Sequence, residues 1–598
     1  MTPAGYVGDL RRSSAASTFG PGAIADLRTQ EGAPISVVMA VAEEWSSLTE
    51  HDLLHDPRLE KLLGVNGFRL APVSSNEVAQ AALAVPAVRF PAWLQCPRCH
   101  VLRPAKDWAP HRDGSAARKC ASCSQDDRGN GSVFVVPVRF VMACDAGHLD
   151  DFDWAHWVRH DTGCHEPRST KLIAEGSGLS GLYVQCGRCE KRRSLEEAFR
   201  NVLTDGWSCR GRRPWTGLPA EDCDRPARLV QRGASNLYFP ITRSSLLIPP
   251  FDNELEDRVS SYWPLVTMAD PREPFVRNLV DQGMVGVPTD VSVEEFIRAV
   301  CEYADLRQGA SSDDLRQAEW GKIRTELGRG TRDFEVRVER VPAGLHGLVD
   351  MVVRIPRLRE LRALTGFTRI VPPPAEGDGP PARRCDVLRS RQKWLPAVEV
   401  RGEGIFLSLA PTALERWESR EDVQERVQTI DSAWRREYQQ RFETSDAPPR
   451  RVTARQLLIH AFAHAVMRQL SLECGYSTAS LRERLYSGDF GAGVLIYTAT
   501  SDADGTLGGL ERQGRSERIA NTVRDAIRAV RWCSSDPLCI EGRMVTPGAC
   551  SIACCHACLH APETSCEDYN RFLDRALLVG SPDVPDLGFF RALVEEDR

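Results

Sequence analysis

The sequence predicts a multidomain α+β protein with several small zinc-stapled modules and a helix-containing C-terminal zinc domain. Its 598 residues exceed what one hydrophobic core supports. Most of its 20 cysteines fall within two stretches, 96–235 and 533–566. Short strand-like runs separate the cysteines of the first stretch, whereas helical periodicity dominates other parts of the chain.

Composition and charge narrow the class of protein. Hydrophobic residues make up 42% and charged residues 26% of the chain, which is typical of a globular protein. The net charge of -6 excludes a protein that is basic throughout, but it permits a local basic stripe. The sequence has no secretory signal pattern and no apolar run long enough to span a membrane, so a cytoplasmic location is expected. In that reducing compartment, paired cysteines are more often metal ligands than disulfides.

Four regions are expected along the chain. They are an N-terminal α/β region (1–95), zinc-binding modules (96–235), a mixed helical middle region with basic segments (236–450) and a C-terminal zinc-binding domain (451–598). The apolar run 35–41 predicts a buried strand, and helical patterns occupy 291–306 and 422–442. A break at 445–449 precedes another long helical pattern at 454–472, which places the last boundary.

The first cysteine set consists of two CxxC knuckles. Cys96 and Cys99 form one knuckle, and Cys120 and Cys123 form the other. A two-residue gap lets both thiolates of a knuckle face one ion, and two knuckles complete the tetrahedron that zinc prefers. The alternative, two exposed thiol pairs, would be prone to oxidation. The spacing therefore predicts a zinc site.

The second set combines one knuckle, Cys186 and Cys189, with two single cysteines, Cys209 and Cys223. We expect these four residues to bind one zinc ion. The sequence leaves the role of several residues between the two sets open, with buried cysteines and packed histidines as the alternative to metal ligands. They are Cys144, His148, His156, His160, Cys164 and His165.

The third set is centred on the knuckle formed by Cys555 and Cys558. The expected ligands are Cys539, Cys555, Cys558 and Cys566, with Cys533 as the alternative fourth ligand and Cys550 and Cys554 nearby. Sites with four cysteines have no open coordination position and are structural. The sequence therefore predicts two or three structural Zn²⁺ sites.

Motifs for an ATP motor or a nuclease are missing from the sequence. It contains no GxxxxGK[ST] P-loop and no His-x-Lys motif of the phospholipase-D type. The segment 176–181 matches GxGxxG, but the residues after it resemble a strand leading to Cys186, so we expect a tight turn rather than a dinucleotide site. We therefore expect no enzymatic activity in this chain.

His460 and His464 lie four residues apart on an expected helix, so they share one face. Metalloproteases use this spacing together with a glutamate after the first histidine, and Ala461 occupies that position here. A polar stripe on a packed helix is the simplest interpretation, and a phosphate-contacting site is an intermediate one. A metal-dependent nucleic-acid hydrolase that also uses the loop containing Asp502 and Asp504 is the remaining alternative.

Two segments of the middle region are locally basic. The residues expected to contact nucleic acid are Arg357, Arg359, Arg362, Arg389, Arg391 and Lys393. Arginine forks suit phosphates, and the neighbouring Trp394 has a ring on which a base can stack. A solvated helix face is the alternative interpretation of the same pattern.

Motifs spread over most of the chain resemble the DrmB family, core subunits of the bacterial DISARM anti-phage system. They are the segments 18–23, 232–236, 358–369, 394–404, 460–464 and 470–476. The tail, with Cys555–Leu559 and Pro562–Cys566, is the most specific. It also resembles the cysteine-bearing domain that ends MrfA-like helicases.

The resemblance implies a partner and a role. In that family the ATPase is a separate helicase, DrmA, and the pair engages DNA, including ends with single-stranded overhangs, and restricts phage DNA. The chain is thus expected to be a non-catalytic, zinc-stabilised subunit that helps a DrmA-type helicase engage DNA, without a membrane partner. A purely architectural bridging subunit is a further alternative.

Overall fold

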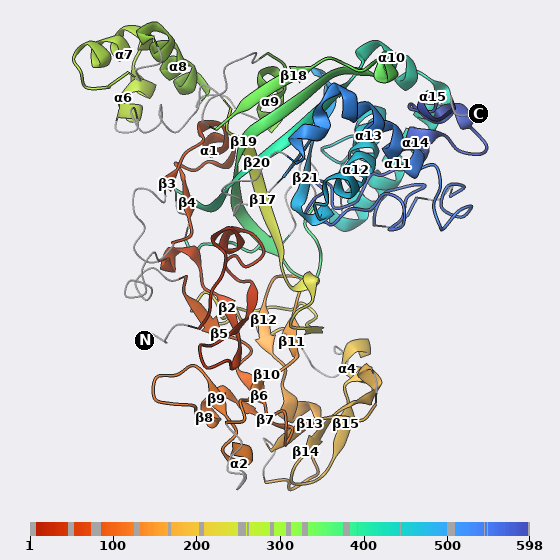
Figure 1. Ribbon diagram of the computed structural model, residues 1–598. Helices are drawn as coiled ribbons and strands as arrows, with labels where there is room; N and C mark the ends of the chain where they lie inside the picture. Colours follow the sequence, from red (N-terminus) through yellow and green to blue (C-terminus); the bar gives the residue numbers. More distant parts are fainter. Residues whose placement is uncertain are drawn as a thin grey trace.

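The computed structural model of the chain is shown in Figure 1. It describes residues 7–595 apart from 46–52, 73–84, 125–131, 166–168, 177, 202–207, 249–258, 260–261, 288–291, 307–311, 326–332, 375–382, 391–392, 443, 499–508, 543–544 and 547. Helices and strands are mixed along the chain, and four-residue sets of potential metal ligands lie in both halves. The predicted α+β class with several cysteine-rich modules is therefore confirmed.

A twisted central sheet organises the upper part of the molecule in Figure 1. Its main path is β17 (Phe239–Leu246), β19 (Val349–Thr368), β20 (Leu395–Leu409), β22 (Gly491–Thr498) and β21 (Leu481–Gly488). The short strands β18 (Glu335–Glu339), β3 (Leu53–Leu54) and β4 (Phe68–Leu70) extend it. Strands β19 and β20 pair over most of their length and carry buried residues on both faces, so the sheet is covered on both sides.

Helices of the C-terminal region cover one face of this sheet (Figure 1). They are α10 (Pro411–Glu418), α11 (Glu421–Phe442), α12 (Ala454–Cys474), α13 (Ser516–Ala529), α14 (Ala576–Val579) and α15 (Ala592–Glu595). Helix α12 begins where the Thr453 side chain accepts a hydrogen bond from the Gln456 N–H, and it ends at Gly475 with a φ of 71°. Its residues are buried on almost every side, so α12 is the centre of the largest core.

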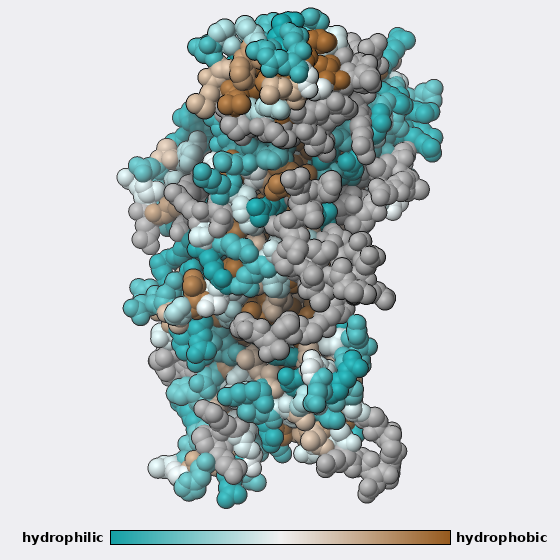
Figure 2. All heavy atoms as spheres, turned by 90° about the vertical axis from the view of Figure 1, so that its left-hand side faces the viewer, coloured by the Kyte–Doolittle hydropathy of each residue, from teal (hydrophilic) through white to brown (hydrophobic). Residues whose placement is uncertain are grey.

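The opposite face of the sheet packs on α1 (Pro57–Leu63), α9 (Ser312–Thr325) and a small helical group. That group is α6 (Trp263–Met268), α7 (Arg272–Asp281) and α8 (Val293–Leu306), at the upper left of Figure 1. Trp320 of α9 contacts the rings of Phe406 and Tyr486 from the sheet. Hydrophobic surface gathers over the helical group in Figure 2, where Leu265, Met268 and Met284 are exposed.

The N-terminal half forms smaller sheets in the lower part of Figure 1. One contains β1 (Ile24–Arg28), β2 (Pro34–Met39) and β5 (Ala87–Arg89), and a second contains β12 (Leu149–Asp151), β11 (Phe140–Ala143) and β16 (Arg228–Gln231). The third follows the order β10 (Val136–Pro137), β6 (Trp93–Gln95), β7 (Val101–Pro104), β13 (Thr170–Ala174), β14 (Leu182–Cys186) and β15 (Arg192–Ser194). The strands β8 (Ala109–Pro110) and β9 (Arg118–Lys119) pair beside it, and α2 (Ala121–Ser124), α3 (Trp154–Trp157) and α4 (Glu196–Asn201) are short.

A buried arginine joins the N-terminal sheets to the central one. The Arg369 side chain, just beyond the end of β19, is fully buried. Its guanidinium donates to the carbonyls of Gly147 at 2.9 Å and Gly22 at 2.6 Å, and also to the carbonyl of Leu237. Three segments distant in sequence are thus held at one point.

The structure confirms several expected elements and corrects others. The expected strand at 35–41 is β2, and the three expected helices are α8, α11 and α12. The described residues 178–181 lead into strand β14, as expected for a turn. The expected boundary at 450 does not separate two cores, because β20 pairs with β22 across it. Within the described residues, no helix combines the length and apolar character needed to cross a membrane.

Candidate metal centres

Five groups of four potential metal ligands occur in the part of the chain that the structure describes. In each group, one donor atom per residue lies within 4.8 Å of the others. Four groups are rich in cysteine and one is mixed, which exceeds the two or three sites that the sequence predicted. We name each group after its first ligand, except the third, which we call the Cys164 cluster.

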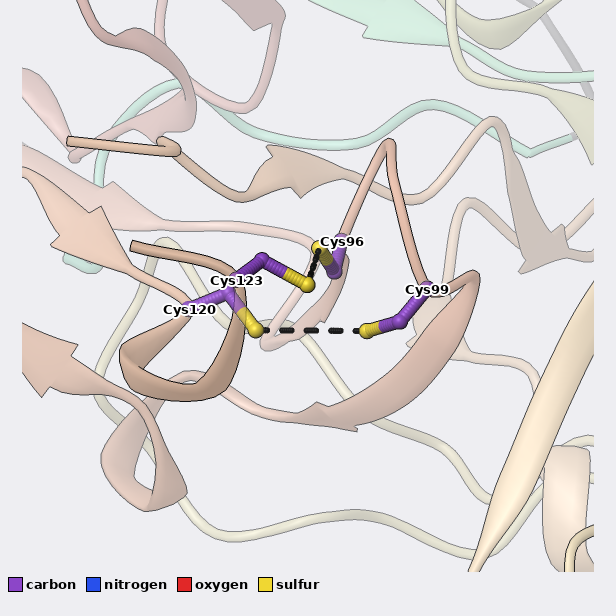
Figure 3. Close-up of side chains that lie close together, drawn as sticks. All are labelled: Cys96, Cys99, Cys120 and Cys123. Atoms are coloured by element: carbon purple, nitrogen blue, oxygen red, sulfur yellow. Dashed lines mark hydrogen bonds between the residues drawn. The ribbon is translucent and has the colours of Figure 1, made fainter. Parts of the chain in front are cut away.

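The Cys96 cluster contains Cys96, Cys99, Cys120 and Cys123, the set expected from the sequence. Figure 3 shows the thiols of its two knuckles pointing toward one another, one knuckle between β6 and β7 and the other after β9. The sulfur–sulfur distances are 3.8 Å for Cys96–Cys123 and 3.9 Å for Cys99–Cys120. A zinc tetrahedron with bonds of about 2.3 Å has sulfur–sulfur edges of about 3.8 Å, so the geometry fits zinc.

The Cys144 cluster contains Cys144, His148, Cys209 and Cys223. The sulfur of Cys144 lies 3.4 Å from Nδ1 of His148, whose Nε2 lies 2.6 Å from a carboxylate oxygen of Glu221. A carboxylate behind an imidazole orients the ring and raises its basicity toward a metal. A hydrogen bond from Cys209, aided by His148, lowers the pKa of Cys144 to about 4, so a thiolate is favoured there.

The Cys164 cluster contains His160, Cys164, Cys186 and Cys189. The sulfurs of Cys164 and Cys186 are 3.9 Å apart, and that of Cys189 lies 3.6 Å from Nδ1 of His160. The His160 Nε2–H donates to the Ala155 carbonyl at 2.9 Å, which leaves Nδ1 as the metal-facing nitrogen. The backbone N–H groups of Asp161 and Lys191 lower the pKa of Cys189 to about 6.

These two clusters correct the second expected set. Cys186 and Cys189 do not share a site with Cys209 and Cys223. The reason is strand pairing: β16, which follows Cys223, pairs with β11, which leads into Cys144. The pairing of β13 with β14 instead brings the segment before β13, including Cys164, to Cys186. Of the residues left open, His156 and His165 belong to neither cluster.

The Cys533 cluster contains Cys533, Cys539, Cys555 and Cys558. The sulfur–sulfur distances are 3.4 Å for Cys533–Cys555 and 3.8 Å for both Cys539–Cys558 and Cys555–Cys558. The expected set was therefore wrong at one position, because Cys533 takes the place assigned to Cys566. The segment around Cys566 turns away to the central sheet, where the Glu483 N–H donates to the Ser565 carbonyl at 3.2 Å.

The fifth group, the His460 cluster, contains His460, His464, Glu483 and Cys566. The two histidines share a face of α12, as expected, and both are fully buried on this packed helix. No sequence pattern indicated that Glu483 of β21 would join them, because that contact depends on the packing of α12 against the sheet. The loop containing Asp502 and Asp504 lies outside the described residues.

Two of the expected nucleic-acid contacts are structural. Arg359 is buried in ion pairs with Asp333 at 2.9 Å and Glu399 at 2.5 Å. Arg362 is buried against Glu360, also at 2.5 Å. Both lie on the central strand β19, where these carboxylates neutralise their charge, and Arg362 also lines a cavity of about 370 Å³.

The other expected contacts lie nearer the surface. The side chain of Arg357 is half-exposed and pairs with Glu335 at 2.7 Å. Arg389 pairs with Glu44, and Lys393 is exposed. Arg391 lies outside the described residues.

The fold and the ligand sets together define a multidomain protein. Modules whose ligand sets suit zinc lie in its N-terminal and C-terminal halves, and the C-terminal module packs on the buried helix α12. Residues 462–559 match the family described as the MrfA Zn-binding domain, and residues 11–239 match a domain of unknown function, DUF8724. The chain is 31% identical over 580 residues to the DISARM protein DrmB of Bacillus paralicheniformis, covering 94% of this chain and 99% of that protein. The chain therefore belongs to the DrmB family.

Among solved structures, part of the chain resembles the crystal structure of the DUF1998 helicase MrfA bound to DNA. The likeness covers 34% of this chain and 21% of that one, at 8% identity and a TM-score of 0.18. That TM-score is too low for an inference about fold. The zinc-binding character of the C-terminal domain rests on the family match and on the Cys533 cluster.

Proposed function

We propose that this chain is a non-catalytic, zinc-stabilised subunit of an anti-phage defence complex, which partners a DrmA-type helicase and helps it engage DNA. The observation that carries the proposal is the 31% identity to the DISARM protein DrmB over 94% of the chain. The sequence contains no P-loop, so an ATP motor of that type would belong to a partner chain. Helping that motor engage DNA is a role that needs no ATP site.

We assign structural Zn²⁺ to the Cys96, Cys144, Cys164 and Cys533 clusters. Each offers four protein donors, and a zinc site with four protein ligands has no position left for substrate. Zinc would supply the cross-link that the three N-terminal modules need, because their strands are short and their cores are small. Rigid modules of this kind suit a subunit that presents fixed surfaces to a helicase and to DNA.

We assign DNA contacts to Arg357, Arg389 and Lys393. The carboxylate partners of the two arginines, Glu335 and Glu44, are near enough to the surface for solvent to weaken the pairs. A phosphate can therefore compete for either guanidinium. Lys393 is exposed beside Trp394, whose ring packs under Arg69 at 4.5 Å.

The central test is to co-purify the chain with its candidate helicase and to measure DNA-stimulated ATPase activity with and without it. Stable association and a changed ATPase rate are expected. No association together with no effect on the rate would overturn the proposal. Association without any change in DNA affinity or rate would favour a bridging subunit instead. Metal-dependent cleavage of nucleic acid by the chain alone, abolished in His464→Ala, would favour a hydrolase.

DNA affinity should also fall steeply with salt, because each phosphate contact releases condensed counterions. Removing one phosphate contact lowers the slope of log affinity against log salt by about one. In the triple variant Arg357→Ala/Arg389→Ala/Lys393→Ala, the slope of log affinity against log salt is therefore expected to become shallower by about three. Fluorescence anisotropy with the helicase complex measures the slope. Arg416→Ala, which removes an exposed arginine of α10, serves as the matched control. An unchanged slope in the triple variant would place the DNA elsewhere.

A further inference from the structure

The His460 cluster joins three parts of the fold deep inside the protein. His460 and His464 come from α12, Glu483 from β21, and Cys566 from the segment that follows the Cys533 cluster. Both histidines are fully buried, and Glu483 is only 2% exposed. Such a combination of imidazoles, a carboxylate and a thiol is costly to bury without a group that satisfies all of them.

The two histidine–carboxylate distances match the edges of a metal tetrahedron. Nε2 of His460 lies 3.3 Å from one Glu483 oxygen and 3.1 Å from the Cys566 sulfur. Nε2 of His464 lies 3.4 Å from the other Glu483 oxygen. Metal bonds of about 2.0–2.1 Å to nitrogen and oxygen give tetrahedral edges of about 3.3–3.4 Å.

The surrounding groups orient the donors toward the middle of the cluster. His464 donates its Nδ1–H to the Leu559 carbonyl at 2.7 Å, which directs the Nε2 lone pair inward. The backbone N–H of Asn570 donates to the Cys566 sulfur at 3.2 Å, and that of Glu567 donates to Glu483 at 3.1 Å. Outer hydrogen bonds of this kind are usual for metal ligands.

Two inward atoms also lack hydrogen-bond partners among the described residues. They are Nε2 of His464 and one carboxylate oxygen of Glu483, both buried. A divalent cation would satisfy them, and together with one thiolate, one carboxylate and two neutral imidazoles it gives a site of zero net charge. Neutrality removes the main obstacle to burying such a site.

We propose that His460, His464, Glu483 and Cys566 bind a zinc ion that is separate from the ion of the Cys533 cluster. The match to the MrfA Zn-binding domain contains all four Cys533-cluster ligands but excludes His460 and Cys566. Thiolate and imidazole donors favour zinc over magnesium or calcium. Glu483 and Cys566 also line a cavity of about 370 Å³, which offers the ion a route of entry.

The site has a structural role, because four protein ligands leave no coordination position open. The ion ties the central helix α12 to strand β21 and holds the segment 559–570 against the sheet. It thereby locks the C-terminal zinc module onto the central sheet. A hydrolase centred on His460 and His464 is inconsistent with this closed set.

A crystal structure of the full chain, with anomalous data collected above and below the zinc absorption edge, tests the site directly. An anomalous peak that is present only above the edge and lies between the four side chains is expected. An empty difference map there, with peaks at the Cys533 cluster, would overturn the proposal. This readout needs no variant and so does not depend on a mutant that folds.

Metal counting by mass spectrometry on the purified full chain gives a second readout. Cys566→Ala is expected to lose one zinc per chain. Cys474→Ala, at the end of helix α12 and outside every cluster, is the matched control and should keep the full count. Equal zinc content in wild-type chain and folded Cys566→Ala would contradict the proposal.

Discussion

Replacing Cys555 with serine is expected to remove one zinc ion per chain and to unfold the C-terminal module, which is the region after residue 530 that carries the Cys533 cluster. Cys555 lies in the Cys533 cluster, 3.8 Å from Cys558 and 3.4 Å from Cys533. A structural zinc contributes on the order of 10 kcal/mol to a small module. That is comparable with the whole stability of a typical domain, about 5–15 kcal/mol, so the module should not survive the loss.

The preceding residue supplies the control. Cys554 is adjacent in sequence but lies outside the four-donor set, with its sulfur 3.6 Å from Nε2 of His560. Cys554→Ser is expected to keep both the zinc and the fold. Zinc content and limited proteolysis of the region after residue 530 distinguish the two variants. If Cys554→Ser lost the zinc while Cys555→Ser kept it, the ligand assignment would be reversed.

The contrast between the cysteine sets explains what the sequence could predict. The Cys96 cluster could be predicted because both of its halves are local knuckles, and a CxxC turn fixes two ligands at once. In two of the three N-terminal knuckles, those of Cys96–Cys99 and Cys186–Cys189, the residue after the second cysteine has a positive φ, of 60° at His100 and 57° at Glu190. This shared backbone turn shows how much of the geometry is local.

Single cysteines could not be assigned in the same way, because their partners are chosen by strand pairing. Cys209 and Cys223 reach Cys144 only through the β11–β16 pair, which joins residues almost ninety positions apart. Cys566 lies away from its expected site for a similar reason, since a backbone hydrogen bond from Glu483 of β21 to the Ser565 carbonyl holds its segment at the central sheet. Sequence spacing carries no information about such pairings.

The prediction for the first basic segment of the middle region failed for a different reason. Arginines at 354, 357, 359 and 362 suggested a solvated helix or a phosphate surface, yet they belong to the 20-residue strand β19. Buried carboxylates such as Asp333 and Glu360 neutralise the inward ones. A run of arginines indicates a charged surface only when no acidic side chain pairs with it, and here the partners come from β19 itself as well as from a neighbouring strand and a loop.

The second large effect is expected at another buried ion pair of this kind. Arg484 of β21 donates two hydrogen bonds of 2.6 Å to Glu319 of α9, and both side chains are buried. Glu319 also accepts from the Leu246 N–H of β17 at 3.0 Å and from the Tyr486 hydroxyl at 3.2 Å. The pair thus holds a helix and two strands of the central sheet together.

Glu319→Ala is expected to lower the free energy of unfolding by about 3–5 kcal/mol, because it leaves the Arg484 guanidinium buried without its partner. Thermal and urea unfolding measure this loss. Glu273→Ala, which breaks the exposed i,i+4 pair with Arg277, should cost at most about 0.5 kcal/mol. An equal loss of unfolding free energy in the two variants would mean that burial of the Glu319–Arg484 pair adds nothing to the stability.

Lowering the pH should remove the stability that the charged Glu319–Arg484 pair contributes. Burial alone would raise the pKa of Glu319, but the charge and hydrogen bonds of Arg484 hold it below its usual value of 4.5. A carboxyl whose pKa is lowered by folding stabilises the protein above its unfolded pKa and loses that contribution as the pH falls through the folded value. The stability gap between wild type and Glu319→Gln is therefore expected to be constant above about pH 5 and to shrink below the usual pKa of 4.5. A gap that is independent of pH would instead mean that Glu319 acts through shape and neutral hydrogen bonds, and the link between α9 and the sheet would not depend on its charge.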